Sequence, residues 1–405
     1  MKTTKKVLSV LMCVCLLCCA MLPAAFAAEK ELTRPEKAHV CFGDDGKFKI
    51  LNAADIQDGA SLMSITKDFI KAAVKEADPD LIVMTGDNIA GYLAKSASSC
   101  EKAIRNVMEV FEEFGIPVAM VFGNHDDQGT ALSKAQQVAI YKEYDCFIGW
   151  EGEPMEKSCA NYNIPIYESK DSDKVSFNIW MMDSGNYYID ENGKENGYGF
   201  VYEEALDWYK LKSDELKAAN GGEAVPSMVF QHIVPVQIYD AFVEVPAGTP
   251  GAVAKFGKYW ILPDNAGEGS ILGEGSCPAN LDIPEARYEF DTMKAQGDVI
   301  AIAFGHDHIN SFVVPYEGID LISCPGCTFR SYNDDNKGFR TFTLDKNNPW
   351  SYETDTFTFN ELFADNELML SKAKMYSFFS SIETMFSNLW SQIEAFFKQL
   401  FTINK

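Results

Sequence analysis

Apolar and polar positions along the first third of the chain follow the order strand, helix, strand, helix, strand. Short apolar runs at 48–54, 81–84 and 117–122 have the length of buried strands. Between them, residues 61–77 and 99–114 carry apolar side chains at the spacing of amphipathic helices. Polar residues follow each strand directly. This order predicts an α/β fold in which the carboxyl ends of the strands bring those polar residues to one edge of a sheet.

The same pattern continues, with longer connections, through the next two hundred residues. The expected strands are 175–182, 227–230, 299–304, 311–315, 319–323 and 339–344, and the expected helices are 132–144 and 202–219. Residues 240–288 are instead rich in Gly, Pro and Asn. Because so long a connection is uncommon unless it has a function, this segment is interpreted as an insertion that faces the substrate.

The first 27 residues have the features of a signal peptide. Three lysines precede an apolar run, and Ala25 and Ala27 supply small side chains at the two positions that mark a cleavage site. We therefore expect a secreted or extracytoplasmic protein, with association to the cell surface as an extension of this hypothesis. A lipoprotein attached through a leader cysteine, or a permanent anchor, are the alternatives. Residues 28–46 form a polar lead-in.

The end of the chain, residues 351–405, is interpreted as a linker followed by an amphipathic helix. Apolar residues recur at helical spacing over 375–401, and many of them are Phe. Charged residues within this segment or just before it exclude a conventional membrane span, namely Lys372, Lys374, Glu383, Glu394 and Lys398. Three roles remain open for this helix: packing on the domain, self-association, or attachment to a membrane surface.

Charge and cysteine content narrow the class of partner. The formal net charge is −24, and loss of the three leader lysines makes the remaining chain still more acidic. Such a surface repels nucleic acids, so no nucleic acid binding is expected. An anionic substrate then needs a local positive centre, which metal ions supply. Seven cysteines remain beyond the leader, an odd and scattered set that indicates mostly buried thiols with room for one or two disulfides.

Histidine placement is the strongest chemical signal. The chain has five histidines, and all except His39 follow predicted strands. His306 and His308 lie two residues apart, so that on an extended segment both imidazoles point the same way, toward one metal cluster. Taken singly, Asp55 suits a loop cap, and Asp87 suits a turn. Taken together, polar clusters at successive strand ends predict one shared site.

The ordered motifs resemble the calcineurin-like metallophosphoesterase superfamily. They are Asp55-Ile56-Gln57, Gly86-Asp87-Asn88, Gly123-Asn124-His125-Asp126, His232 and Gly305-His306-Asp307-His308. The domain is placed at 47–350. Three further segments, 183–185, 197–199 and 231–235, are similar to the purple-acid-phosphatase-like branch. The resemblance implies a four-layer α/β/β/α sandwich with a dinuclear metal centre of Mn, Fe or Zn.

The resemblance also implies a role for each motif residue. One metal is expected on Asp55, Gln57, Asp87 and His308, and the second on Asp87, Asn124, His232 and His306. A hydroxide held between the metals is expected to attack a small phosphate mono- or diester. His125 is expected to protonate the leaving group. Asp126 is grouped with it as a supporting acid, although a loop acid suits the same position.

Gln57 departs from the family, whose first motif usually ends in His. Its neutral oxygen is a harder and weaker ligand than imidazole. Gln57 either binds the first metal, lies outside its ligands, or leaves that site weak. The alternatives to a phosphoesterase are therefore a catalytically weak or non-catalytic surface binding protein, and an exported nucleotidase. The presence of His125 favours an enzyme, because a binding protein has no need of a general acid.

Overall fold

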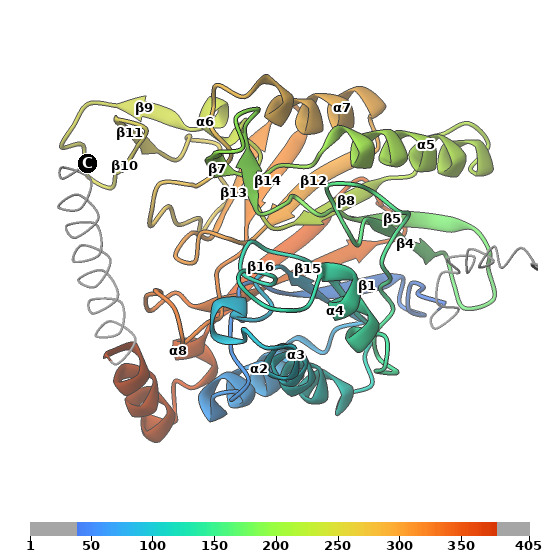
Figure 1. The fold of residues 1–405 in the computed structure, drawn as a ribbon. Coiled ribbons are helices and arrows are strands. Elements are labelled where there is room, and N and C mark those ends of the chain that lie inside the picture. The colour runs from blue at the N-terminus through green and yellow to red at the C-terminus, as the bar shows by residue number, and fades with distance from the viewer. Residues whose placement is uncertain (1–38, 379–405) are drawn as a thin grey trace, which may run out of the picture. The chain divides into compact units, whose positions relative to one another are not determined.

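Two β-sheets pack face to face between two layers of helices, which is the predicted four-layer sandwich (Figure 1). The computed structural model describes residues 39–378, which belong to one compact unit, Pro35–Lys405. The strand orders are β16-β15-β1-β2-β3 and β13-β14-β12-β8-β5-β4. Side chains from the inner faces share one core. For example, the rings of Phe230 on β8 and Phe342 on β15 have centroids 5.5 Å apart.

The first sheet is built on the predicted strand and helix order. Its three parallel strands are β1 (Lys47–Ala53), β2 (Leu81–Thr85) and β3 (Val118–Val121). The intervening helices are α2 (Ser64–Ala77) and α3 (Ala97–Glu112), followed by α4 (Lys134–Tyr141). The buried residues of α2 and α3 recur at the predicted spacing, and both helices cover the outer face of this sheet (Figure 1). Antiparallel β15 (Gly338–Asp345) and β16 (Tyr352–Thr358) complete it.

The second sheet combines predicted and unpredicted strands. It contains β4 (Tyr162–Tyr167), β5 (Val175–Met181), β8 (Ser227–Gln231), β12 (Val299–Phe304), β13 (Phe312–Tyr316) and β14 (Ile319–Ser323). Helices α5 (Glu203–Ala219) and α7 (Tyr288–Gln296) cover its outer face (Figure 1). The parallel strands β5, β8, β12 and β14 end at the same edge of the sandwich as β1, β2 and β3. The polar residues that follow these strands therefore meet there.

Two edge strands were not expected from the sequence. β4 contains Pro165, and the polar segment around it gave no strand signal; at the edge of the sheet a proline is tolerated. β16 reads Tyr-Glu-Thr-Asp-Thr-Phe-Thr, a polar pattern suited to an edge strand with one exposed side. Because β16 pairs with β15, the sheet continues past residue 350, where the sequence predicted the linker to begin.

The predicted insertion has some structure of its own. It carries a small sheet of β9 (Val243–Val245), β10 (Val253–Lys255) and β11 (Lys258–Ile261), after the short helix α6 (Ile238–Ala241). A separate hairpin of β6 (Tyr187–Ile189) and β7 (Glu195–Tyr198) follows β5. Short helical turns lie at η1 (Gly91–Leu93), η2 (Pro284–Arg287) and α8 (Phe359–Leu362). The insertion therefore extends the rim on the side of the second sheet.

The terminal predictions fall largely outside the described residues. The signal peptide at 1–27 and lead-in residues 28–38 lie there, as do residues 379–405 of the expected terminal helix. Residues 367–378 are helical. Across residues 39–378, no helix is long and apolar enough to cross a membrane. All seven cysteines in this part of the chain are free thiols, so the disulfides for which the sequence left room are not formed.

Candidate metal centre

Loops that leave neighbouring strands hold the predicted ligands. Asp55, Asp87 and Asn124 follow β1, β2 and β3, while His232 follows β8 and His306 follows β12. Ligand atoms of Asp55, Asp87 and His232 all lie within 4.8 Å of one another, and all three residues are buried. The predicted convergence of these three strand ends therefore takes place at one rim of the sandwich.

Further predicted residues surround that cluster. His232 Nε2 lies 3.4 Å from Asp87 Oδ2 and 3.1 Å from Asn124 Oδ1. His308 Nε2 lies 3.4 Å from Asp55 Oδ1. His306 donates its backbone N–H to Asp55 Oδ2 at 3.0 Å. Carboxylate, amide and imidazole groups thus alternate around a common space, which is the donor set of Mn, Fe and Zn sites.

Unpartnered oxygens mark where a cation fits. Asp55 Oδ1 and Gln57 Oε1 are buried and accept no hydrogen bond. A buried acceptor without a partner destabilises the fold by about 1–3 kcal/mol, and a bound cation removes that penalty. The side chain of Gln57 is 1% exposed, so bulk water does not supply the missing partner. The residues present therefore fit a metal centre, and Gln57 is tied to it through its backbone N–H, which donates to Asp87 O at 2.7 Å.

Glycines in the motifs permit close packing around the ligands. A Cβ on Gly86 would lie 2.5 Å from the His232 ring, and one on Gly123 would lie 2.3 Å from the Asp87 backbone nitrogen. A Cβ on Gly305 would lie 2.6 Å from Asp55 Oδ2. Real Cβ atoms do not approach other atoms this closely. The glycines are therefore required by the geometry of the site.

Backbone strain gathers at the same residues. Asp55, Gln57, Asp87 and His306 adopt positive φ angles of 53°, 45°, 49° and 75°. A non-glycine residue held in this region is destabilised by about 1–3 kcal/mol, and such residues concentrate at functional sites. Four of the eight positive-φ non-glycine residues in the described part of the chain are predicted ligands. The strain thus marks the rim independently of the motifs.

Hydrogen bonds to backbone carbonyls orient two imidazoles. His232 Nδ1 lies 2.9 Å from Thr85 O, and His308 Nδ1 lies 2.6 Å from Tyr332 O. A carbonyl accepts only from a protonated nitrogen, so each ring keeps Nε2 for the carboxylate side. Burial lowers the pKa of His232, but the nearby Asp87 carboxylate outweighs burial and raises this pKa to about 10.

His125 differs from the other site histidines in exposure. Its side chain is 28% exposed, against 0% for His232 and 3% for His308. Its Nδ1 contacts Gln128 Oε1, and its Nε2 lies 3.9 Å from Asp87 Oδ2. The backbone N–H of His125 donates to Asp87 Oδ1 at 2.7 Å. His125 therefore stands between the buried ligands and solvent, where a substrate would enter.

Asp126 faces backbone amides behind the rim. Its Oδ2 accepts from Gly123 N at 2.7 Å, and its Oδ1 accepts from Ile89 N at 3.0 Å. Burial, with the charge of Asp87 added, raises the pKa of Asp126 to about 8. These contacts tie the loop after β2 to the loop after β3. Asp126 is thus a positioning residue that holds these two loops together.

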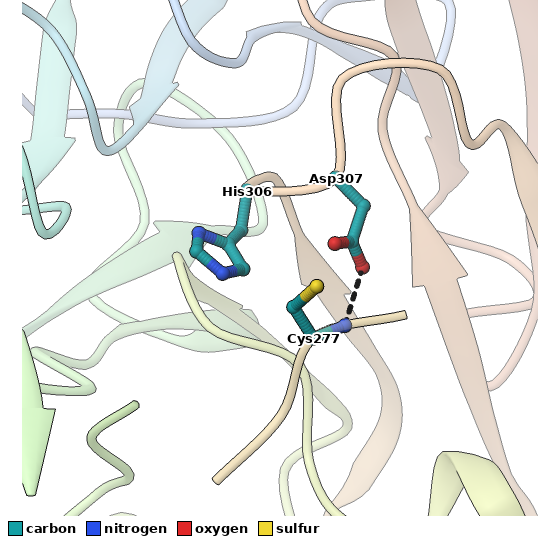
Figure 2. A group of neighbouring side chains, drawn as sticks. All are labelled: Cys277, His306 and Asp307. Atoms are coloured by element: carbon teal, nitrogen blue, oxygen red, sulfur yellow. Dashed lines mark hydrogen bonds between the residues drawn. The ribbon is translucent and has the colours of Figure 1, made fainter. Parts of the chain in front are cut away.

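The structure adds neighbours of the site histidines whose contacts the sequence did not predict. Cys277, from the insertion, lies beside His306 and Asp307 (Figure 2), and one ligand atom from each lies within 4.8 Å of the others. Tyr198 packs edge-on against His306 with ring centroids 4.3 Å apart, and Tyr332 stacks on His308 at 4.3 Å. The sequence pointed only to the segments that carry two of these residues, the insertion 240–288 for Cys277 and the motif 197–199 for Tyr198, because the contacts join residues that are distant in sequence.

Comparison with known proteins places these motifs in a family. The model described as "Calcineurin-like phosphoesterase" matches residues 48–310. The chain is 25% identical over 338 residues to "Probable inactive purple acid phosphatase 28" of Arabidopsis thaliana, covering 75% of this chain and 76% of that protein. It is 26% identical to "Phosphatase DCR2" of Saccharomyces cerevisiae, covering 66% of this chain and 45% of that protein.

A solved structure of similar fold is a dimetal phosphatase from Danio rerio, with a TM-score of 0.44 and 13% identity. That match covers 77% of this chain and 99% of the other. The family match and the purple acid phosphatase relatives confirm the predicted resemblance to the superfamily and to that branch.

Proposed function

Because the chain belongs to the calcineurin-like phosphoesterase family, we propose that it is a metal-dependent hydrolase of small phosphate mono- or diesters. The observation that carries this proposal is the position of His125. A partly exposed imidazole lies 3.9 Å from Asp87, beside a buried set of carboxylate, amide and imidazole donors. A binding protein gains nothing from such a proton donor at the entrance of a cation site.

The predicted ligand sets are kept in the proposal. Asp55, Gln57, Asp87 and His308 would hold one ion, and Asp87, Asn124, His232 and His306 would hold the other. When bound, the two ions supply Lewis-acid stabilisation of the charge on the phosphoryl group and activate the water that attacks it. The contact between Asn124 Oδ1 and His232 Nε2, and the contact between Asp55 Oδ1 and His308 Nε2, support these pairings.

His125 would act on the leaving group. The contact of Nδ1 with Gln128 Oε1 fixes the ring and leaves Nε2 directed at the cluster. A protonated Nε2 would donate its proton to the leaving oxygen as the ester bond breaks, which typically contributes about a hundredfold to ten-thousandfold in rate. Asp87 Oδ1 stabilises this position of His125 by accepting a hydrogen bond from its backbone N–H.

A catalytically weak or non-catalytic surface protein is the second candidate. Gln57 in place of the usual histidine favours it, and three Arabidopsis relatives are named "probable inactive". Against it, a yeast relative is named a phosphatase, and Gln57 retains an unpartnered buried oxygen at the site. The two candidates differ in turnover, and both predict binding of cations.

The cellular setting and the finer specificity are proposals of the same kind. We propose export with cleavage after residue 27, which N-terminal sequencing of the secreted protein would test. An exported nucleotidase is a variant of the same chemistry with a nucleoside leaving group. Absence of nucleic acid binding, and self-association or membrane-surface attachment through 375–401, stay predictions.

Hydrolysis assays test the main proposal. The purified protein would be loaded with Mn²⁺, Fe²⁺ or Zn²⁺ and assayed with p-nitrophenyl phosphate, bis-p-nitrophenyl phosphate and a nucleoside monophosphate. We expect metal-dependent release of product from at least one ester. Stoichiometric metal binding without turnover on any ester would favour the non-catalytic candidate, and failure to bind metal would reject both.

A further inference from the structure

A second group of potential ligands lies on the flank of the metal centre. Cys277 Sγ lies between the ring of His306 and the carboxylate of Asp307 (Figure 2). The backbone N–H of Cys277 donates to Asp307 Oδ2 at 3.2 Å, which joins the insertion to the loop after β12. Sulfur, nitrogen and oxygen donors from two distant segments thus face a common space.

The hydrogen bonds of the fold satisfy only one of the two carboxylate oxygens of Asp307. Asp307 is 1% exposed, and its Oδ1 is buried without a hydrogen bond. Among residues 39–378, no lysine or arginine forms an ion pair with it. An isolated buried carboxylate destabilises the fold unless a positive partner is present. Asp307 Oδ1 is therefore a buried acceptor that a cation bound in this space would satisfy.

The segment that carries Cys277 is held in place before any ion binds. Tyr239 Oη donates to Ser276 O at 2.6 Å, and Asn310 Oδ1 accepts from the backbone N–H of Gly273 at 2.9 Å. Lys255 Nζ lies 2.7 Å from Cys277 Sγ, so the sulfur already attracts a positive group. Lys255 lies at the end of β10, and its long side chain is able to swing away from the sulfur.

We propose that Cys277, His306 and Asp307 form an additional site for one divalent cation of the Zn²⁺ type. Thiolate, imidazole and carboxylate are the donors that Zn²⁺ prefers, and three protein ligands leave a fourth position for water. Binding releases the thiol proton to solvent, and the thiolate and Asp307 then balance the two positive charges. Apart from His306, the site is separate from the ligand sets assigned above.

His306 links the new site to the dinuclear centre. A neutral imidazole binds an ion through one ring nitrogen only, so His306 serves an ion on each side as an imidazolate, after its ring N–H proton is released to solvent. The rings of His306 and His232 have centroids 5.1 Å apart, which places His306 between the two groups of donors. Occupancy of the new site does not require turnover, so it is testable whether or not the proposed hydrolysis is observed.

Cobalt substitution and metal analysis test the site in the full chain. After dialysis against Co²⁺, we expect a near-ultraviolet thiolate-to-cobalt charge-transfer band in the wild type. Cys277→Ser should abolish this band and bind about one equivalent less metal, as three protein ligands become two. The matched control is Cys159→Ser, another partly buried free thiol, which should keep the band. An unchanged band and metal content in Cys277→Ser would overturn the proposal.

Alkylation provides a second measurement in the wild type, so that a poorly folded variant does not block the test. Iodoacetamide labelling of Cys277, followed by peptide mass spectrometry, should slow when Zn²⁺ is added, while labelling of Cys159 should not change. Equal labelling of Cys277 with and without Zn²⁺ would also overturn the proposal. A positive result here combined with no ester hydrolysis would reject the proposed function and leave the new site standing.

Discussion

The two sides of the rim are built in different ways. On the side of the first sheet, Asp55 and Asp87 are held by backbone hydrogen bonds and lie against glycines. A Cβ added to one of these glycines would clash with Asp55 or Asp87. On the side of the second sheet, the insertion brings Cys277 to Asp307, and a buried oxygen remains without a partner. The first side is thus fixed by the backbone. The second is assembled by side chains from distant segments.

The sequence predicted the first side well for a physical reason. β1, β2 and β3 are short apolar runs separated by helices of clear period, so the positions of Asp55, Asp87 and Asn124 followed from order alone. The strand lengths differed from expectation by one or two residues. The motif identified Gln57, but only the structure shows that its Oε1 is buried without a hydrogen bond.

The second side was less predictable, because its contacts join residues far apart in sequence. Cys277 and His306 are separated by a helix and a strand, and no periodic pattern connects them. β4 and β16 escaped detection because polar edge strands lack an apolar pattern. Asp126 was grouped with the catalytic residues by its place in the motif, whereas its two amide contacts make it a positioning residue.

Loss of the proposed proton donor should have the largest effect. For His125→Ala we expect kcat to fall by about a hundredfold to ten-thousandfold, with metal content unchanged. Steady-state kinetics and metal analysis on the same preparation check this. His39→Ala is the control, since His39 is exposed and stacks on Tyr167 away from the site. Full activity in His125→Ala would remove this residue from the mechanism.

A methyl group on the backbone-fixed side should disturb both folding and metal binding. Gly86→Ala places a Cβ 2.5 Å from His232 at a φ of +84°. We expect a loss of stability of about 1–3 kcal/mol from overpacking, with weaker metal binding. Gly115→Ala is the matched control, because Gly115 has φ +64° and open space around it.

Denaturant unfolding and metal titration of both variants separate the clash from the backbone strain. Gly115→Ala should lose stability through strain alone and keep its metal. Equal metal affinity in the two variants would show that the close packing at Gly86 does not position His232.

Gln57 tests how tightly the first ion is held. Gln57→Ala should raise the Kd of one ion by about 10–100-fold, a range that changes near a metal site commonly produce. Gln57→His restores the usual imidazole and should lower that Kd. Isothermal titration with Mn²⁺ measures both. Identical binding by all three proteins would place Gln57 outside the ligand set.

Glu289, a buried acid on α7, should make the stability of the fold depend on pH. Burial raises its pKa from 4.5 to about 8. Between these values the folded state holds a proton that the unfolded state has released, so stability falls as pH rises. The expected contribution is up to about 1.4 kcal/mol per pH unit. Glu289→Gln should remove that slope in urea unfolding between pH 5 and pH 8, roughly the window set by the two pKa values. An unchanged slope would contradict the shift.

The central claim is that one rim gathers a dinuclear centre from five strand ends. Anomalous diffraction from crystals of the protein grown with Mn²⁺ tests it most directly. The account predicts two neighbouring peaks, one beside Asp55 and His308 and one beside Asn124 and His232, with Asp87 between them. A map with no peak at Asp87, from protein that hydrolyses phosphate esters, would contradict it.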